Sequence, residues 1–154
     1  MSNPKALALF GKLRGSAAGR WLFSRIVCRT TPYFASISPV FEALEPGRCV
    51  ARIKHRRKVT NHIGTVHAIA CCNLAELCAG VGTEVTVPAS MRWIPKGMTV
   101  RYLKKAIGTL TGTANIPAIV EGLAQEIVVP VAIVNTAGER VVEADITMYV
   151  TPRK

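Results

Sequence analysis

Alternation of apolar and polar side chains runs through much of the chain and predicts strands that bury one face. Five segments alternate in this way or are rich in valine, isoleucine and threonine: 48–57, 98–102, 108–115, 126–134 and 142–150. Pro130 interrupts the fourth of these segments, which predicts a strand edge or a bulge. Residues 135–138 read Asn-Thr-Ala-Gly and predict a hairpin turn between the last two strands.

Helical spacing replaces alternation in three other segments. Residues 5–30 predict one helix, which is weakened by its glycines and ended by a proline. Residues 34–44 predict a second, short helix. Residues 65–80 are small or apolar nearly all round, which is typical of a buried helix, and Gly80 and Gly82 predict its end.

Together these elements predict an α+β protein, with an antiparallel sheet of about five to six strands wrapped around a central buried helix. The 154-residue length suits one main core. We therefore divide the chain into a basic amphipathic N-terminal helix, residues 1–31, and a main domain, residues 32–154. The longest uncharged stretch, residues 59–75, contains histidines, asparagines and a glycine, so we expect no integral membrane segment.

Charge is distributed unevenly along the chain, which has a net charge of +11. Residues 1–58 hold 12 basic and two acidic side chains, whereas residues 59–154 hold eight and seven. This asymmetry indicates either an anionic partner or a solvated basic surface. The N-terminal segment has the composition of a targeting peptide or a membrane-surface helix, but we expect a helix docked on the domain.

The five cysteines indicate a reduced protein with buried thiols. Their odd number and the absence of a Cys-x-x-Cys pair argue against a disulfide framework and a zinc site. We therefore expect a cytoplasmic location, no metal and no other cofactor. A redox role for the adjacent Cys71 and Cys72 is the alternative to simple core packing.

The predicted central helix carries few polar residues, and these are the candidates for chemistry. A carboxylate such as Glu76 costs several kcal/mol in an apolar helix unless it is paired or reaches solvent, so a role as general base is one reason to keep it. His67 lies nine residues earlier and therefore points to the opposite side of the helix. The two residues can meet only if two chains pair along these helices. The first amides of the helix, near Ala68, would suit a developing oxyanion.

The segment Asn61–Ala68, followed by Leu74-Ala75-Glu76, resembles the signature of hotdog-fold thioesterases of the phenylacetyl-CoA thioesterase type. In that family a histidine opens the central helix. An asparagine lies six residues before this histidine, and an Asp or Glu lies nine residues after it. Asn61, His67 and Glu76 have these spacings. Residues 102–108 resemble the strand-and-turn motif that follows, and the likeness spans residues ~32–152. Within the superfamily, the sequence is most similar to an uncharacterised subgroup.

The resemblance implies an acyl-CoA substrate and a site at the interface of a homodimer or of a dimer of dimers. Glu76 would activate water or attack the thioester carbonyl, and the Ala68 N–H would polarise the carbonyl oxygen. His67 and Asn61 would orient the thioester or the water. Residues placed beside the substrate are Gly64, Thr65, Asn73 and Gly80, with Arg101, Lys104, Lys105 and the run 56–58 as candidates for the coenzyme A phosphates.

Two departures from the family pattern leave alternatives open. Ala68-Ile69 stands where the family has Gly-Gly, so Ile69 narrows the space beside the oxyanion donor. Gly80 stands where some relatives have Ser or Thr. One alternative is a non-catalytic protein that binds acyl-CoA or acyl carrier protein. Another is a binder of nucleic acid or membranes through the basic N-terminus, with nucleic acid disfavoured because aromatics are 6% of the chain and none lie within 52–58.

Overall fold

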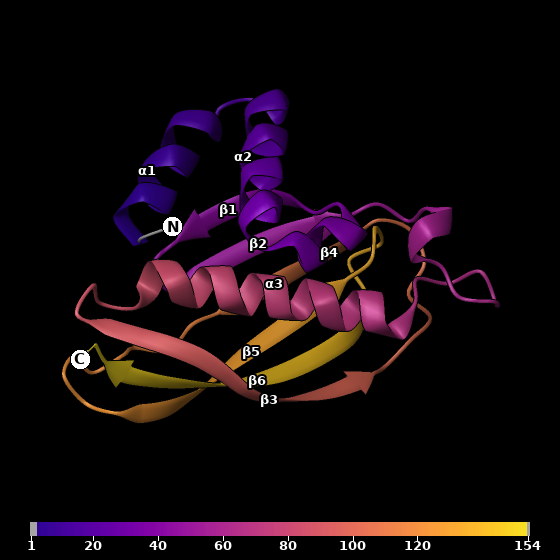
Figure 1. Cartoon of the computed structure of the whole chain (residues 1–154). Coiled ribbons are helices and arrows are strands. Elements are labelled where there is room, and N and C mark those ends of the chain that lie inside the picture. Colours follow the sequence, from indigo (N-terminus) through magenta and orange to yellow (C-terminus); the bar gives the residue numbers. More distant parts are fainter. Residues whose placement is uncertain (1–2, 154) are drawn as a thin grey trace.

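A computed structural model describes residues 3–153 of the chain (Figure 1). The helices are α1 (Asn3–Leu13), α2 (Ala17–Thr30) and α3 (Ala68–Thr86), with short 3-10 turns η1 (Pro32–Ile37) and η2 (Arg57–Val59). The strands are β1 (Val40–Glu45), β2 (Arg48–Ile53), β3 (Met91–Tyr102), β4 (Leu110–Asn115), β5 (Gln125–Val134) and β6 (Arg140–Pro152).

The six strands form one antiparallel sheet in the order β1-β2-β4-β5-β6-β3. Helix α3 lies along one face of this sheet and contacts every strand (Figure 1). The α+β prediction of a sheet wrapped around a buried helix is therefore confirmed, and the arrangement is the hotdog fold. β1 and β3 are the two edge strands, so β3 runs beside α3 with one side unpaired among the described residues.

Helix α3 is longer than the sequence pattern predicted. It continues past Gly80 and Gly82, both buried, and ends at Thr86, with Val87 as the cap residue before a proline. A Cβ atom at Gly80 would lie 3.2 Å from the Trp93 ring, and one at Gly82 would lie 2.4 Å from Ile116. These glycines therefore allow close packing of the helix, and the prediction that they end it is wrong.

By length and composition α3 could also cross a membrane, contrary to the expectation drawn from the uncharged stretch. In the fold, however, twelve of its residues are buried. The sheet and the N-terminal helices supply the apolar surroundings that a bilayer would otherwise provide. This burial identifies α3 as the core helix of the domain.

The N-terminal segment forms two helices instead of the single predicted helix. Ser16 caps α2 by accepting a hydrogen bond of 3.0 Å from the Gly19 N–H. The helices dock on the domain through Phe10 and Phe23, whose rings lie edge to face at 5.0 Å, and Phe23 meets Phe41 of β1 at 5.3 Å. The expected docking is thus confirmed.

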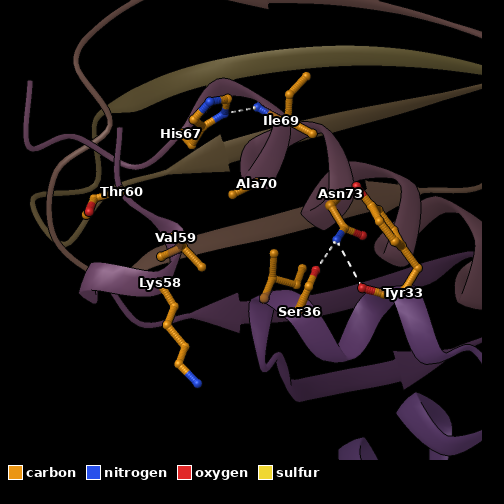
Figure 2. Close-up of a pocket in the computed structure, with 10 residues that line it drawn as sticks. Tyr33, Ser36, Lys58, Val59, Thr60, His67, Ile69, Ala70 and Asn73 are labelled. Atoms are coloured by element: carbon orange, nitrogen blue, oxygen red, sulfur yellow. Dashed lines mark hydrogen bonds between the residues drawn. The ribbon is translucent and has the colours of Figure 1, made fainter. Parts of the chain in front are cut away.

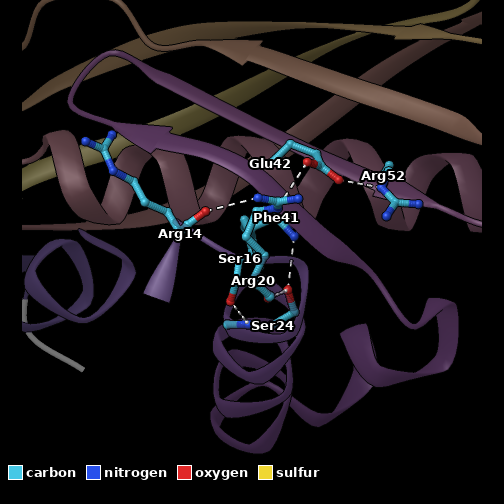
Figure 3. Close-up of polar contacts among 8 residues, drawn as sticks. Arg14, Ser16, Arg20, Ser24, Phe41, Glu42 and Arg52 are labelled. Atoms are coloured by element: carbon cyan, nitrogen blue, oxygen red, sulfur yellow. Dashed lines mark hydrogen bonds and ion pairs between the residues drawn. The ribbon is translucent and has the colours of Figure 1, made fainter. Parts of the chain in front are cut away.

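Polar contacts also fix α2 to the sheet (Figure 3). The Ser24 hydroxyl of α2 accepts a 3.0 Å hydrogen bond from the Phe41 N–H and donates one of 2.7 Å to the Arg20 carbonyl. The Glu42 carboxylate pairs with Arg20 and with Arg52 of β2. The division of the chain at residue 31 stays a prediction.

Three local predictions need correction or refinement. The helix predicted for 34–44 is wrong, because the chain forms η1 and then β1, with a left-handed Ser38 (φ 47°) between them. The strand predicted for 48–57 ends at Ile53. Pro130 lies where β5 extends beyond its pairing with β4, which covers only 131–134, so the predicted strand edge is confirmed.

Candidate functional site

The loop before α3 is organised by Asn61. Its side-chain oxygen accepts hydrogen bonds of 3.1 Å from the N–H groups of Ile63 and Thr65, and its amide donates one of 2.8 Å to the Thr65 hydroxyl. Gly64 takes a positive φ of 79° inside this turn, and Thr65 is buried. The loop thereby holds the chain in a fixed path into α3.

His67 caps the start of α3. Its Nδ1 accepts a 3.0 Å hydrogen bond from the Ile69 N–H, which requires Nδ1 to be unprotonated and places the ring hydrogen on Nε2. The His67 N–H donates to the Val59 carbonyl at 2.7 Å. The Ala68 N–H donates no hydrogen bond to any acceptor within residues 3–153. This amide is therefore available to a ligand at the helix start.

A cavity of about 180 Å³ opens beside this helix start (Figure 2). Its lining comes from η1, η2 and the first turns of α3: Tyr33, Ser36, Ile37, Lys58, Val59, Thr60, His67, Ile69, Ala70 and Asn73. The Asn73 amide donates a hydrogen bond of 3.0 Å to the Ser36 hydroxyl and one of 3.5 Å to the Tyr33 carbonyl. Asn73 is buried, and its oxygen has no hydrogen-bond partner in the described structure.

Glu76 lies in a different hollow, an apolar groove of about 410 Å³. The groove is lined by Ala6, Val27, Thr30, Thr31, Phe34, Glu76, Gly80, Val81, Glu84, Trp93 and Pro95. Glu76 is half-buried, and no cation or hydrogen-bond donor among residues 3–153 pairs with its carboxylate. Of the two structural alternatives, pairing with an arginine or lysine is absent among residues 3–153, whereas partial exposure to solvent is what Glu76 adopts.

Trp93 of β3 lines the same groove. Its indole N–H donates a 2.8 Å hydrogen bond to the Glu84 carboxylate. The ring packs against Gly80, which has no side chain to keep it away. Trp93 and Glu84 have no signal in the sequence, because strand β3 brings Trp93 onto α3 from outside the motif.

One chain does not bring His67 and Glu76 together. The residues line separate cavities, and nine residues of helix separate them by about 13 Å along the axis. The α3 face that carries Ile69, Cys72 and Glu76 is only partly covered, and Ile69 is 55% exposed. The edge strand β3 beside it exposes further apolar side chains, including Ile94, Tyr102 and, just beyond, Leu103.

The predicted phosphate ligands differ in availability. Arg101 pairs with Glu143 at 2.8 Å, and Lys104 pairs with Glu139 at 2.7 Å. Lys105 is exposed and has no carboxylate partner among the described residues. Two of these three residues are therefore already neutralised by neighbouring carboxylates. In the run 56–58, the further candidate, Arg56 contacts Ser36 and Ser38, and Lys58 lines the cavity at the start of α3.

The Cys71 thiol beside the site is kept protonated by its surroundings. Burial raises the pKa of Cys71 to about 12. The Cys72 sulfur lies 3.1 Å from the Tyr102 hydroxyl, and this hydrogen bond, with burial, raises the pKa of Tyr102 to about 12. All five cysteines are free, and within residues 3–153 no three His, Cys, Asp or Glu side chains are grouped to hold a metal ion.

Solved structures share this fold over nearly the whole chain. A structural-genomics protein is 42% identical over 96% of this chain and 98% of its own, with a TM-score of 0.83. A Pseudomonas aeruginosa protein described as a probable thioesterase of unknown function is 22% identical over 99% of both chains, with a TM-score of 0.77. A Haemophilus influenzae thioesterase is 12% identical over 82% and 87%, with a TM-score of 0.72.

No curated protein matches the sequence. The protein family DUF4442, a domain of unknown function, matches residues 19–150. The match begins inside α2, includes all six strands and ends within the last of them, β6. The chain therefore belongs to the DUF4442 family.

Proposed function

We propose that this protein is a thioesterase that hydrolyses acyl-CoA, with Glu76 as general base or nucleophile. The observation that carries the proposal is the Glu76 carboxylate, which lies without a partner in an apolar groove. A half-exposed carboxylate that no cation neutralises is available to act as a base or nucleophile. The thioesterases among the structures that share the fold support the same reaction class.

The start of α3 supplies the complementary half of the chemistry. The free Ala68 N–H, at the positive end of a long helix, suits the oxygen of a thioester carbonyl as negative charge develops on it. His67 lines the same cavity, and because its Nδ1 accepts from Ile69, its Nε2 is left to donate a hydrogen bond. Asn61 acts as a positioning residue, because its side chain is engaged in holding the loop that leads to this helix start.

The two halves require two chains. Glu76 and Ala68 lie eight residues apart, about 12 Å along the helix, whereas a reacting carbonyl must be roughly 3 Å from both groups. A two-fold axis beside the partly covered face of α3 would set Glu76 of one copy opposite Ala68 of the other. The unpaired edge of β3 lies beside this face, and Tyr102 on β3 and Ile69 on α3 expose apolar surface for such a homodimer. A dimer of dimers would preserve this unit.

A thiol-release assay over acyl-CoA esters, from acetyl to long-chain and aryl, tests the proposal, together with sedimentation of the same sample. We expect turnover of at least one ester and a mass of at least two chains. Turnover by a monomer would contradict the two-chain site.

The free cysteines support a reducing, cytoplasmic location.

A non-catalytic acyl-CoA or acyl-carrier-protein binder is the second candidate. The exposed Ile69 side chain, next to the oxyanion donor, favours it, because this bulk restricts approach of the carbonyl. Acyl-CoA binding without release of thiol from any ester would identify this function. The variant Ile69→Gly, which restores the space, would then be expected to gain turnover.

A further inference from the structure

A second concave surface lies between the start of α2 and the end of β2. It is a cleft of about 420 Å³ lined by Ala17, Trp21, Ser38, Val40, Arg52, Lys54 and Arg56. The cleft shares no lining residue with the cavity at the start of α3 or with the Glu76 groove. We call it the α2–β2 cleft.

The α2–β2 cleft is strongly basic. Three of its seven lining residues are cations, and the nearest carboxylate, Glu42, is shared between Arg20 and Arg52. Lys54 and Arg56 have no carboxylate partner among residues 3–153. Arg56 instead donates from one nitrogen to the Ser36 carbonyl and the Ser38 hydroxyl, so its position is fixed while its charge stays uncompensated. Such a site favours an anion with several oxygens.

An indole forms one wall of the same cleft. Trp21 is 54% exposed, which is unusual for so large an apolar ring, and the Arg25 guanidinium lies 5.6 Å from its centroid. Ser38 also lines the cleft and has a strained, left-handed backbone. A ring beside fixed cations suits a ligand that combines a planar heterocycle with phosphate groups.

The cleft is connected to the proposed reaction site through η1. The Ser36 carbonyl accepts a 3.2 Å hydrogen bond from Arg56 of the cleft, and the Ser36 hydroxyl accepts one of 3.0 Å from Asn73 of the cavity. The cavity with His67 and the α2–β2 cleft are therefore neighbours across a single residue. A ligand could lie in both if a flexible chain crossed η1.

We propose that the α2–β2 cleft binds the phosphorylated adenine nucleotide of coenzyme A, with the ring on Trp21 and phosphates on Lys54 and Arg56. The assignment rests on the proposed function, which supplies acyl-CoA as the substrate. It replaces Arg101 and Lys104, which are paired with carboxylates. The concave shape favours a compact nucleotide over a flat anionic bilayer.

Fluorescence of Trp21 tests binding without any turnover. In the variant Trp93→Phe, Trp21 is the only tryptophan. Coenzyme A and adenosine 3′,5′-bisphosphate are expected to quench it saturably, and quenching is expected to weaken as salt rises. Dephospho-coenzyme A, which lacks one phosphate, should bind more weakly. An absence of quenching by all three would overturn the proposal.

A substitution then separates this cleft from other basic surfaces. The ratio to measure is the KM for acyl-CoA divided by the KM for the matching N-acetylcysteamine thioester, which lacks the nucleotide. Lys54→Ala is expected to raise this ratio about tenfold, because it removes one charge-assisted hydrogen bond to a phosphate. Lys54→Arg should restore the ratio, and Lys105→Ala should not change it. A changed ratio for Lys105→Ala alone would overturn the assignment.

The remaining outcomes distinguish this inference from the proposed function. Saturable quenching in a protein that hydrolyses no ester would support the cleft and reject the thioesterase. Turnover of acyl-CoA with no effect of Lys54→Ala on the KM ratio would support the thioesterase and reject the cleft as the nucleotide site. A blue shift of Trp21 on anionic phospholipid vesicles, without quenching by coenzyme A, would overturn the nucleotide site in favour of a membrane surface.

Discussion

The Trp93 indole donates a 2.8 Å hydrogen bond to the Glu84 carboxylate, and both residues line the apolar groove that holds Glu76. The Trp93 ring packs against Gly80, which lies one helical turn after Glu76 on α3, or about 6 Å along the axis. The ring therefore lies beside the groove close to Glu76 and is held there by Glu84. We expect it to restrict the acyl group that enters the groove.

Filling this groove should change the acyl preference. In Gly80→Val the new side chain takes space beside Trp93, since even a Cβ atom would lie 3.2 Å from the ring. We expect kcat/KM for decanoyl-CoA to fall about tenfold relative to acetyl-CoA, in line with the cost of overpacking. Gly11→Val, at a helical glycine with open space around it, is the control. An equal loss for both esters would argue against a groove for the acyl chain.

The aromatic contact between the N-terminal helices and the sheet should dominate their docking. Phe23 is fully buried between Phe10 and Phe41, so Phe23→Ala should lower the free energy of unfolding by about 3–5 kcal/mol. Urea unfolding measures this value. Leu22→Ala, at the exposed neighbouring position, should cost well under that. Similar losses for both variants would mean that the helices pack differently.

The loop before α3 should depend on the amide of Asn61. Asn61→Ala removes three side-chain hydrogen bonds, so we expect faster proteolytic cleavage within 61–65 and a lower kcat. Asn61→Asp keeps the acceptor oxygen for both N–H groups and should restore most of the protection. If Asp restores protection but not kcat, Asn61 contacts the substrate directly.

Alkaline pH should destabilise the fold through Cys71. The pKa of this thiol is raised to about 12 by burial, whereas an unfolded thiol ionises near 8.5. The folded state therefore keeps a proton that the unfolded state loses, and stability should fall as pH rises from about 9 toward 12. Urea unfolding at about pH 8 and pH 10.5 should show a smaller decline for Cys71→Ala than for the original chain. An unchanged slope would contradict the burial effect.

Most of the fold was predictable because its strands bury one face. Val142, Ala144 and Ile146 alternate with polar residues, and the structure buries these three on one side of β6. The small, apolar character of 65–80 likewise predicted the buried helix. The helix predicted for 34–44 failed because Phe41 and Leu44 have a spacing that suits either a helix or a bulged strand, and β1 has a bulge between Phe41 and Ala43.

Predictability was lower for the site, because much of it depends on contacts between distant segments. The motif identified Asn61, His67 and Glu76, and the structure assigns definite surroundings to each. Nothing local indicated that Trp93 would pack on Gly80, since this contact depends on the register of β3. The basic character of 52–58 was visible, but its meeting with Trp21 required the docking of α2.

The thiol-release rate of Glu76→Gln, measured on the ester that the original chain hydrolyses fastest, tests the central claim most directly. We predict a fall in kcat of at least about a hundredfold, the usual contribution of a general base, with an unchanged melting temperature. Glu45→Gln, at an exposed carboxylate in a surface ion pair, should retain full activity. A Glu76→Gln protein that hydrolyses the ester as fast as the original chain would contradict the assignment of the reaction to this carboxylate.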